Sequence, residues 1–297
     1  MKYRLLLKLL VICVLIIGLT IPILMIRDLV SERSYYRDEA KQSIAASWTG
    51  AQKLLGPILV LPYAERTKSM VWDANKERKH LVEQVNERRL FVLPSNLEID
   101  AKVRTEERSR GIYAIPVYES AIDVSGVFEN KRILALLKDK AVTVHWDKAF
   151  LSMPVSDIRG IVVEPVLRWN GGDREFVSGS GIGTQGGGMM AGVGGLDVSQ
   201  PARFSFSFSV QVHGMETLQF SPVGKSTRVA VQSAWRHPSF LGRYLPNERT
   251  IDEQGFSAEW RISSFSGDMA RIRALCESGK CDQFFNNTFG VALIQPV

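Results

Sequence analysis

The densest group of nucleophilic, basic and aromatic side chains lies between Trp235 and Tyr244. Within it, His237 and Ser239 stand two positions apart, on either side of Pro238. A hydrolase would use Ser239 as its nucleophile and His237 as the base, and sequence does not exclude a triad that geometry assembles. However, no Gly-x-Ser-x-Gly turn surrounds Ser239, and the sequence identifies no acid partner. Neither the nucleophile nor an orienting group is therefore supported.

Two other interpretations explain the same segment. In a structural role, His237-Pro238 forms a fixed turn, the histidine bonds to backbone, and Trp235 and Phe240 enter the core. In a binding role, aromatic and basic side chains form the centre of an interface with a protein or a glycan. The candidate contact segment consists of Trp235, His237, Phe240, Arg243 and Tyr244.

Metal and nucleotide sites find little support. The four histidines are scattered without ligand spacing, so we predict no metal and no cofactor; they are His80, His145, His213 and His237. Pro222 to Thr227 is similar to the tail of a phosphate-binding loop. Gln219 stands where that loop needs its first glycine, and predicted strands flank the segment, so a hairpin turn is expected.

The three cysteines fall into two groups. Cys13 lies in an apolar stretch and is expected to be inert packing. Cys276 and Cys281 enclose four residues, and in an oxidising compartment they would close a small disulfide loop. Two free thiols are the alternative, and we favour the disulfide.

A glycine-rich segment spans residues 179–195, where nine of seventeen residues are glycine. Ordering so many glycines is costly, which predicts a mobile loop. A lid or a membrane-touching loop that carries Met189 and Met190 is the functional alternative.

These groups need elements to position them, and the first is an apolar stretch. Leu9 to Ile26 holds 18 residues without a charge, enough with its flanks to cross a bilayer. It exceeds the apolar run of a signal peptide, so residues 1–27 are predicted as a retained anchor. Residues 28–50 continue as a juxtamembrane helix, in which Tyr36, Ala40, Ile44 and Trp48 share one face. Lys and Arg counts on the two sides do not decide the orientation, and we favour an N-terminus inside the cell.

After residue 50 the apolar period changes to two. Phe204, Phe206, Phe208, Val210 and Val212 alternate with polar residues and give the strongest strand signal. One helix is predicted within this part, over Asn130 to Asp139. Residues 51–297 are therefore expected to form a mainly antiparallel, sandwich-like β domain, with a division into two lobes near 179–195 as an option.

The chain has a net charge of +6 and an isoelectric point near 9.2. From Lys76 to Arg110, nine basic residues alternate with seven acidic ones. Such mixing indicates a solvated surface or mild attraction to anionic lipid. We predict no nucleic-acid partner.

Three blocks of residues, in order along the chain, carry a resemblance. They run from Ile21-Pro22 to Gly56-Pro57, from Glu106 to Tyr113, and from Trp235 to Trp260. The third includes WRHPSFLG and GFSAEW and is specific. Together they resemble the CreD inner-membrane protein family of Gram-negative bacteria.

This resemblance implies an inner-membrane protein with a large periplasmic domain, linked to cell-envelope integrity and envelope stress. It implies no established catalytic activity, and we expect a non-enzyme that contacts membrane lipid and an envelope protein or glycan. Family members continue into further membrane helices, whereas this sequence stops at Val297. We therefore expect a truncated member, a fragment or a split gene.

Overall fold

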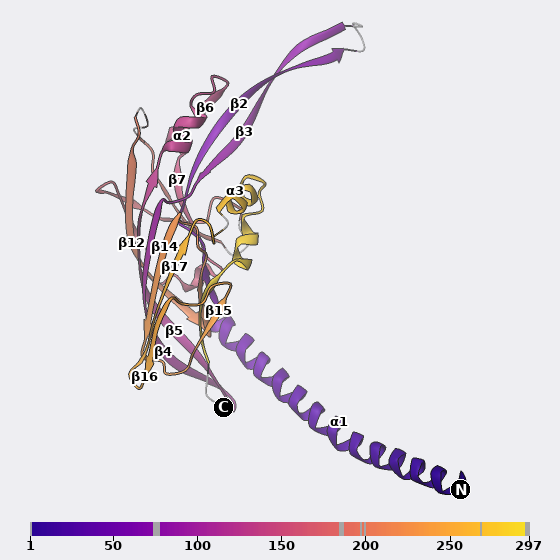
Figure 1. Ribbon diagram of the computed structural model, residues 1–297. Coiled ribbons are helices and arrows are strands. Elements are labelled where there is room, and N and C mark those ends of the chain that lie inside the picture. The colour runs from indigo at the N-terminus through magenta and orange to yellow at the C-terminus, as the bar shows by residue number, and fades with distance from the viewer. Residues whose placement is uncertain are drawn as a thin grey trace. The chain divides into compact units, whose positions relative to one another are not determined.

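A computed structural model describes residues 2–73, 78–183, 187–196, 198, 200–267 and 269–294. These residues form a mainly β structure with an apolar N-terminal helix, which confirms the predicted fold class (Figure 1). The chain divides into two compact units. One contains Met1–Ser47 and Arg108–Ile115, and the other contains Trp48–Glu107 and Pro116–Val297.

The first unit is built on α1 (Lys2–Ser47), a single helix of 46 residues. Its apolar stretch presents Leu, Ile and Val side chains on every face, and none of that stretch is buried within the protein. A helix that is apolar all round and longer than the ~30 Å hydrocarbon layer is typical of a membrane span. Among the described residues, one helix meets this test, over Leu10–Ser47.

The same unit holds the tip of a hairpin formed by β4 (Asn96–Arg110) and β5 (Tyr113–Glu129). The Tyr113 hydroxyl donates a hydrogen bond to the Arg33 carbonyl oxygen at 3.2 Å. Of the predicted stripe on α1, Ala40 is buried, whereas Tyr36 remains 49% exposed.

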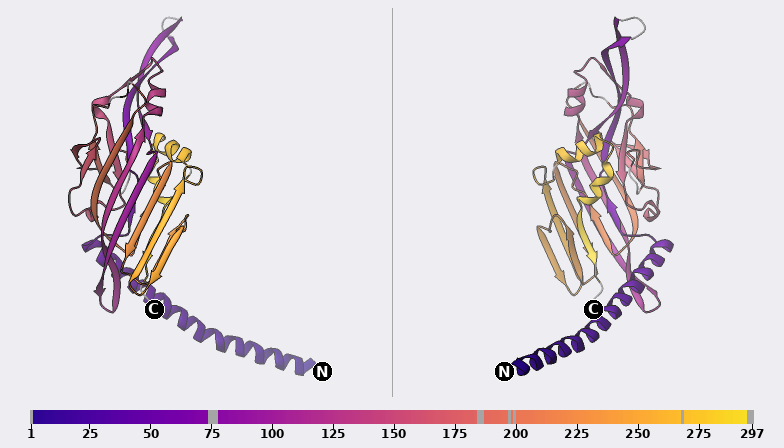
Figure 2. Two further views of the ribbon diagram at one scale, coloured as in Figure 1. Left: turned by 60° about the vertical axis from the view of Figure 1, so that its left-hand side comes forward. Right: turned by 90° about the vertical axis from the view of Figure 1, so that its right-hand side faces the viewer.

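Three sheets make up the second unit. The eight-stranded sheet has the order β16-β17-β14-β4-β5-β12-β8-β9. The left view of Figure 2 shows its orange and yellow strands beside the purple and magenta ones. Pairing between β14 and β4 is parallel. The other strands of this sheet are β8 Val166–Trp169, β9 Gly172–Glu175, β12 Arg203–Met215, β14 Ser226–Ser233, β16 Glu248–Asp252 and β17 Gly255–Ser263.

The six-stranded sheet has the order β10-β11-β7-β2-β3, and β6 pairs with β2 outside this path. Its pairings are antiparallel. Two long strands, β2 (Ile58–Asp73) and β3 (Arg78–Val92), form a hairpin whose far part extends beyond the other strands (Figure 1). The shorter strands are β6 Val142–Val144, β7 Phe150–Pro154, β10 Val177–Ser178 and β11 Gly188–Gly192.

A four-stranded sheet of order β1-β13-β18-β15 completes the set. Its strands are β1 Gln52–Leu54, β13 Thr217–Phe220, β15 Pro238–Gly242 and β18 Phe289–Leu293. Two short helices, α2 (Lys131–Leu136) and α3 (Met269–Glu277), pack beside the sheets. Single 3-10 turns occupy Trp146–Lys148, Ile158–Gly160 and Cys281–Asn286.

Period-two alternation explains the core. In β12 the five apolar side chains predicted to face inward are buried, while the residues between them are exposed or half-buried. Trp260, Tyr118 and Phe128 are among the largest wholly buried side chains. Each such burial contributes roughly 1.5–3 kcal/mol relative to exposure.

The prediction of a mobile loop over residues 179–195 is wrong for residues 188–192. Residues 188–192 form β11, which pairs with β7 and β10. Met189 is 3% exposed, so it neither covers a site nor touches a membrane. Gly181 and Gly188 permit close packing: a Cβ at Gly181 would lie 2.7 Å from the Phe150 ring, and one at Gly188 would lie 2.7 Å from the Met153 carbonyl oxygen. Residues 184–186 lie outside the described part, and the division into two lobes stays a prediction.

Two further expectations change. Pro222 to Thr227 is no hairpin turn, since it connects β13 in one sheet to β14 in another. The helix predicted from Asn130 to Asp139 is limited to α2, and α3 was not predicted.

Candidate functional site

The candidate contact segment surrounds β15, which holds Phe240 and pairs with β18. Its aromatic rings pack within the domain. The Phe240 ring meets the Trp260 ring edge-on at 5.7 Å, and the Tyr244 hydroxyl donates to the Ser266 carbonyl oxygen at 2.6 Å. The Trp235 indole N–H lies 3.1 Å from two carbonyl oxygens, those of His237 and Ile294. His237 and Arg243 are the exposed members of the segment.

The structure places His237 before β15 and Ser239 within it. His237 is exposed, while Ser239 is half-buried and paired with Ala292 across the strands. In the described part of the chain, no side-chain hydrogen bond joins His237 to Ser239 or either residue to a carboxylate. The hydrolase interpretation therefore gains no support from this geometry.

The structure joins Cys276 and Cys281 by a disulfide, with their Cα atoms 4.3 Å apart. Both cysteines are buried at the end of α3. The described histidine side chains lie apart from each other: His213 stacks on Trp48 at 4.1 Å, and His145 lies 3.3 Å from the Glu87 carboxylate. Within the searched, described residues, no group of three or more metal-ligating side chains gathers.

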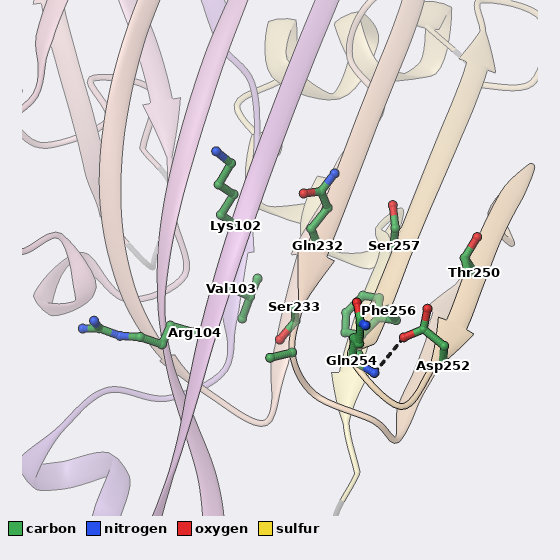
Figure 3. Close-up of a pocket in the computed structure, with 12 residues that line it drawn as sticks. Lys102, Val103, Arg104, Gln232, Ser233, Thr250, Asp252, Gln254, Phe256 and Ser257 are labelled. Carbon is green, nitrogen blue, oxygen red and sulfur yellow. Dashed lines mark hydrogen bonds between the residues drawn. The ribbon is translucent and has the colours of Figure 1, made fainter.

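A shallow groove of about 470 Å³ lies on the polar face of the eight-stranded sheet. Figure 3 shows Lys102, Gln232, Ser257 and Thr250 in one row across four neighbouring strands. The strand register requires this row, because Gln232 pairs with both Lys102 and Ser257, and Ser257 pairs with Thr250. At the turn between β16 and β17, the Asp252 carboxylate accepts a hydrogen bond from the Gln254 backbone N–H at 2.8 Å. The groove offers mixed donors and acceptors on a flat surface.

Beside this groove, ion pairs connect four strands. Arg228 on β14 lies 3.0 Å from the Asp100 carboxylate on β4 and 2.9 Å from Glu259 on β17. Arg261 also pairs with Glu259, and with Glu248 at 3.1 Å. Burial alone would raise the pKa of the Glu259 carboxyl. Hydrogen bonds from Arg228 and Arg261 outweigh burial and lower this pKa below its ordinary value.

The far part of the β2–β3 hairpin is a second accessible surface, hereafter the β arm, formed by residues 66–73 and 78–85. Met70, Leu81 and Val85 are 64%, 59% and 56% exposed. Met70 pairs with Leu81 across the two strands. Leu81 and Val85 lie four positions apart on β3, and side chains an even number of positions apart point to the same side, so all three share one face. Sequence reasoning missed this surface, because Val82 and Glu83 interrupt the alternation of apolar and polar residues on β3.

The architecture defines a class: an N-terminal apolar helix of membrane-spanning length attached to a β-rich unit. The chain belongs to the CreD family of inner membrane proteins. The family model described as "Inner membrane protein CreD" matches residues 4–297. The chain is 30% identical over 278 residues to the Escherichia coli (strain K12) protein of that description. This match covers 94% of the chain and 59% of the relative, so the chain spans about three fifths of that protein's length.

A likeness to a solved structure is weak. An M1 zinc metallopeptidase from Deinococcus radiodurans superposes with a TM-score of 0.27 at 9% identity. The superposition covers 57% of this chain and 39% of the peptidase. At that level it carries no argument about fold or function.

Proposed function

We propose that this protein is a non-catalytic contact module of the cell envelope. In this proposal α1 anchors the chain in inner-membrane lipid with the N-terminus in the cytoplasm. The β-rich unit lies in the periplasm and contributes to envelope integrity or the envelope-stress response. Membership of an inner-membrane protein family supports the membrane part. The contact role rests on the surface described next.

The observation that carries the proposal is the exposed apolar face of the β arm. Eight residues of β2 beyond Glu65 extend roughly 27 Å at the ordinary rise of a strand. An isolated two-stranded hairpin is marginally stable in water, because neither face is covered. Exposed apolar side chains gathered on one face are typical of an interaction site. We infer that a protein of the envelope covers this face.

Charge favours a protein partner over a hydrocarbon layer. Arg66, Lys68 and Glu83 share the face that carries Met70 and Leu81. Burying such charges in lipid tails is costly, whereas a protein partner can pair them at the rim of an apolar contact. Alternating charges also discourage uncontrolled strand pairing along the outer edge of β3.

In-cell photo-crosslinking tests the contact. A crosslinker at Leu81 or Val85 is expected to capture one envelope protein reproducibly. A crosslinker at Gln84, which points to the opposite face, is the matched control and should not capture it. Met70→Ser should reduce capture from position 85 without changing the abundance of the chain. Equal capture from 81 and 84, or none from either, would contradict the proposed face.

The orientation and the absence of catalysis need separate tests. Lys140→Cys provides an exposed thiol, while Cys13 lies in the apolar helix and the other two cysteines are bonded. A membrane-impermeant maleimide should label this variant from the periplasmic side of intact inner membrane. Turnover of an envelope substrate by the purified chain, abolished by Ser239→Ala, would overturn the non-catalytic assignment.

A further inference from the structure

One small cavity of the β-rich unit is lined by more cations than carboxylates. It has a volume of about 220 Å³ and lies where β3 and β5 end beside α2, α3 and the start of β14. The charged residues around it are Lys131, Arg132, Lys225, Arg273 and Glu129. Three sequence segments that are far apart supply these groups. The cavity is separate from the groove in Figure 3 and from the β arm.

The single carboxylate is already shared. Glu129 lies 3.2 Å from the Lys131 ammonium group, 3.4 Å from that of Lys225 and 3.8 Å from the Arg203 guanidinium. The hydrogen bond from Lys131 is the main cause that lowers the pKa of the Glu129 carboxyl, so the group stays ionised near neutral pH. One negative charge thus faces three positive ones.

Arg132 has partners of its own. It donates to the Phe91 carbonyl oxygen at 3.1 Å and pairs with Glu277 at 3.3 Å. Arg273 differs: among the residues that the structure describes, none places a carboxylate within 4 Å of its guanidinium. Burial lowers the pKa of Arg273 and the nearby positive charge of Arg132 lowers it further, whereas the negative charge of Glu277 raises it. The net effect is a lowered pKa, so Glu277 compensates this half-buried cation only in part, and an anion in the cavity would stabilise it.

Apart from Ser95 and Ser264, the rest of the lining is apolar. Val92, Leu93 and Met269 contribute buried side chains to the cavity wall. The volume lies below the 300–1,000 Å³ that drug-sized ligands occupy, so only a small body fits. A guanidinium favours planar, paired contacts with phosphate or carboxylate oxygens.

We propose that this cavity binds an amphipathic anion, in which a phosphate or carboxylate head meets Arg273, Lys131 and Lys225 and a short apolar body contacts Met269. The same chemistry exists in a soluble ester and in a lipid headgroup with its first carbons. Neither the proposed contact function nor the β arm is needed for this site.

Calorimetric titration of the full chain in nanodiscs of zwitterionic lipid tests the proposal. Butyl phosphate is expected to bind more tightly than inorganic phosphate, and butanol is expected not to bind. Arg273→Gln should weaken butyl phosphate binding at least about tenfold, equivalent to about 1.4 kcal/mol. Lys140→Gln removes an equal charge from an exposed turn elsewhere and should leave the affinity unchanged. Met269→Gln should reduce the difference in affinity between butyl phosphate and inorganic phosphate.

Three results would overturn the site. The first is no heat of binding when butyl phosphate is added to the folded chain. The second is an equal loss of affinity for butyl phosphate in Arg273→Gln and Lys140→Gln. The third is an equal affinity for butyl phosphate and inorganic phosphate. Thermal unfolding of each variant verifies that a lost signal is not a lost fold. Nanodiscs with anionic lipid then identify the source. If anionic lipid weakens the binding of butyl phosphate to the unsubstituted chain, the site is assigned to a lipid headgroup. If the affinity for butyl phosphate is unchanged, the site is assigned to a soluble anion.

Discussion

Gly188→Ala is expected to destabilise the β-rich unit strongly, because β11 can approach β7 only through a residue without a side chain. Gly188 has φ +145°, a conformation that costs other residues about 1–3 kcal/mol. A Cβ there would lie 2.7 Å from both the Met153 carbonyl oxygen and the Pro154 Cα. Overpacking of this kind costs about 1–3 kcal/mol more. The expected loss is therefore roughly 2–6 kcal/mol in the free energy of unfolding.

Gly192→Ala is the matched control in the same strand. A Cβ at Gly192 meets nothing within 4 Å, and its φ is not in the positive region. This variant should stay within about 1 kcal/mol of the unsubstituted chain. Thermal unfolding followed by the fluorescence of the buried Trp169 and Trp260 measures both variants. The Gly188→Ala midpoint should fall by about 4–24 °C. Equal midpoints for the two variants would refute the docking of β11 described above.

Three other predictions concern single interactions. Replacing Cys276 and Cys281 by serine should lower the free energy of unfolding by about 2 kcal/mol, given the short loop they close, and reductant should have the same effect on the unsubstituted chain but none on the variant. Tyr118→Phe should cost about 1–2 kcal/mol in denaturant unfolding, because the buried hydroxyl donates to the Thr217 carbonyl oxygen at 2.7 Å; an unchanged midpoint would show that this bond does not form. The pKa of Glu259 is lowered on folding, so its contribution to stability is present above the ordinary value of 4.5 and is lost as the pH falls below it. Stability measured from pH 5 to pH 3 should fall less steeply in Arg228→Gln, and identical slopes would contradict the ion-pair geometry.

The local sequence pattern was sufficient to predict a strand where one face of that strand is buried and the other is exposed to solvent. The phenylalanines of β12 and the alternation of β4 predict both strands, because burial selects every second residue. The apolar stretch of α1 was equally clear, since its composition is uniform over a membrane-spanning length. These signals depend on neighbours in sequence and need no knowledge of the fold.

Other elements depend on residues that only the fold brings together. The glycines around β11 look like a flexible linker until the fold places the Phe150 ring against Gly181 and the β7 backbone against Gly188. β15 begins at Pro238, where a turn was expected, because pairing with β18 supplies its ladder. The cation-lined cavity draws on α2, α3 and the turn before β14, so no spacing rule finds it.

The parallel pairing of β4 with β14 has a consequence for how the chain matures. Leu97 pairs with Thr227, about 130 residues further along, and only after that are β17 and β16 added beside β14. At a synthesis rate of about 5–20 residues per second, the edge of β4 waits roughly 7–26 s for its neighbour. During that interval the hairpin of β4 and β5 presents an open edge of the kind that pairs with other chains. Folding of the eight-stranded sheet therefore depends on a late, non-local pairing, and β4 is most exposed to pairing with other chains before β14 is in place.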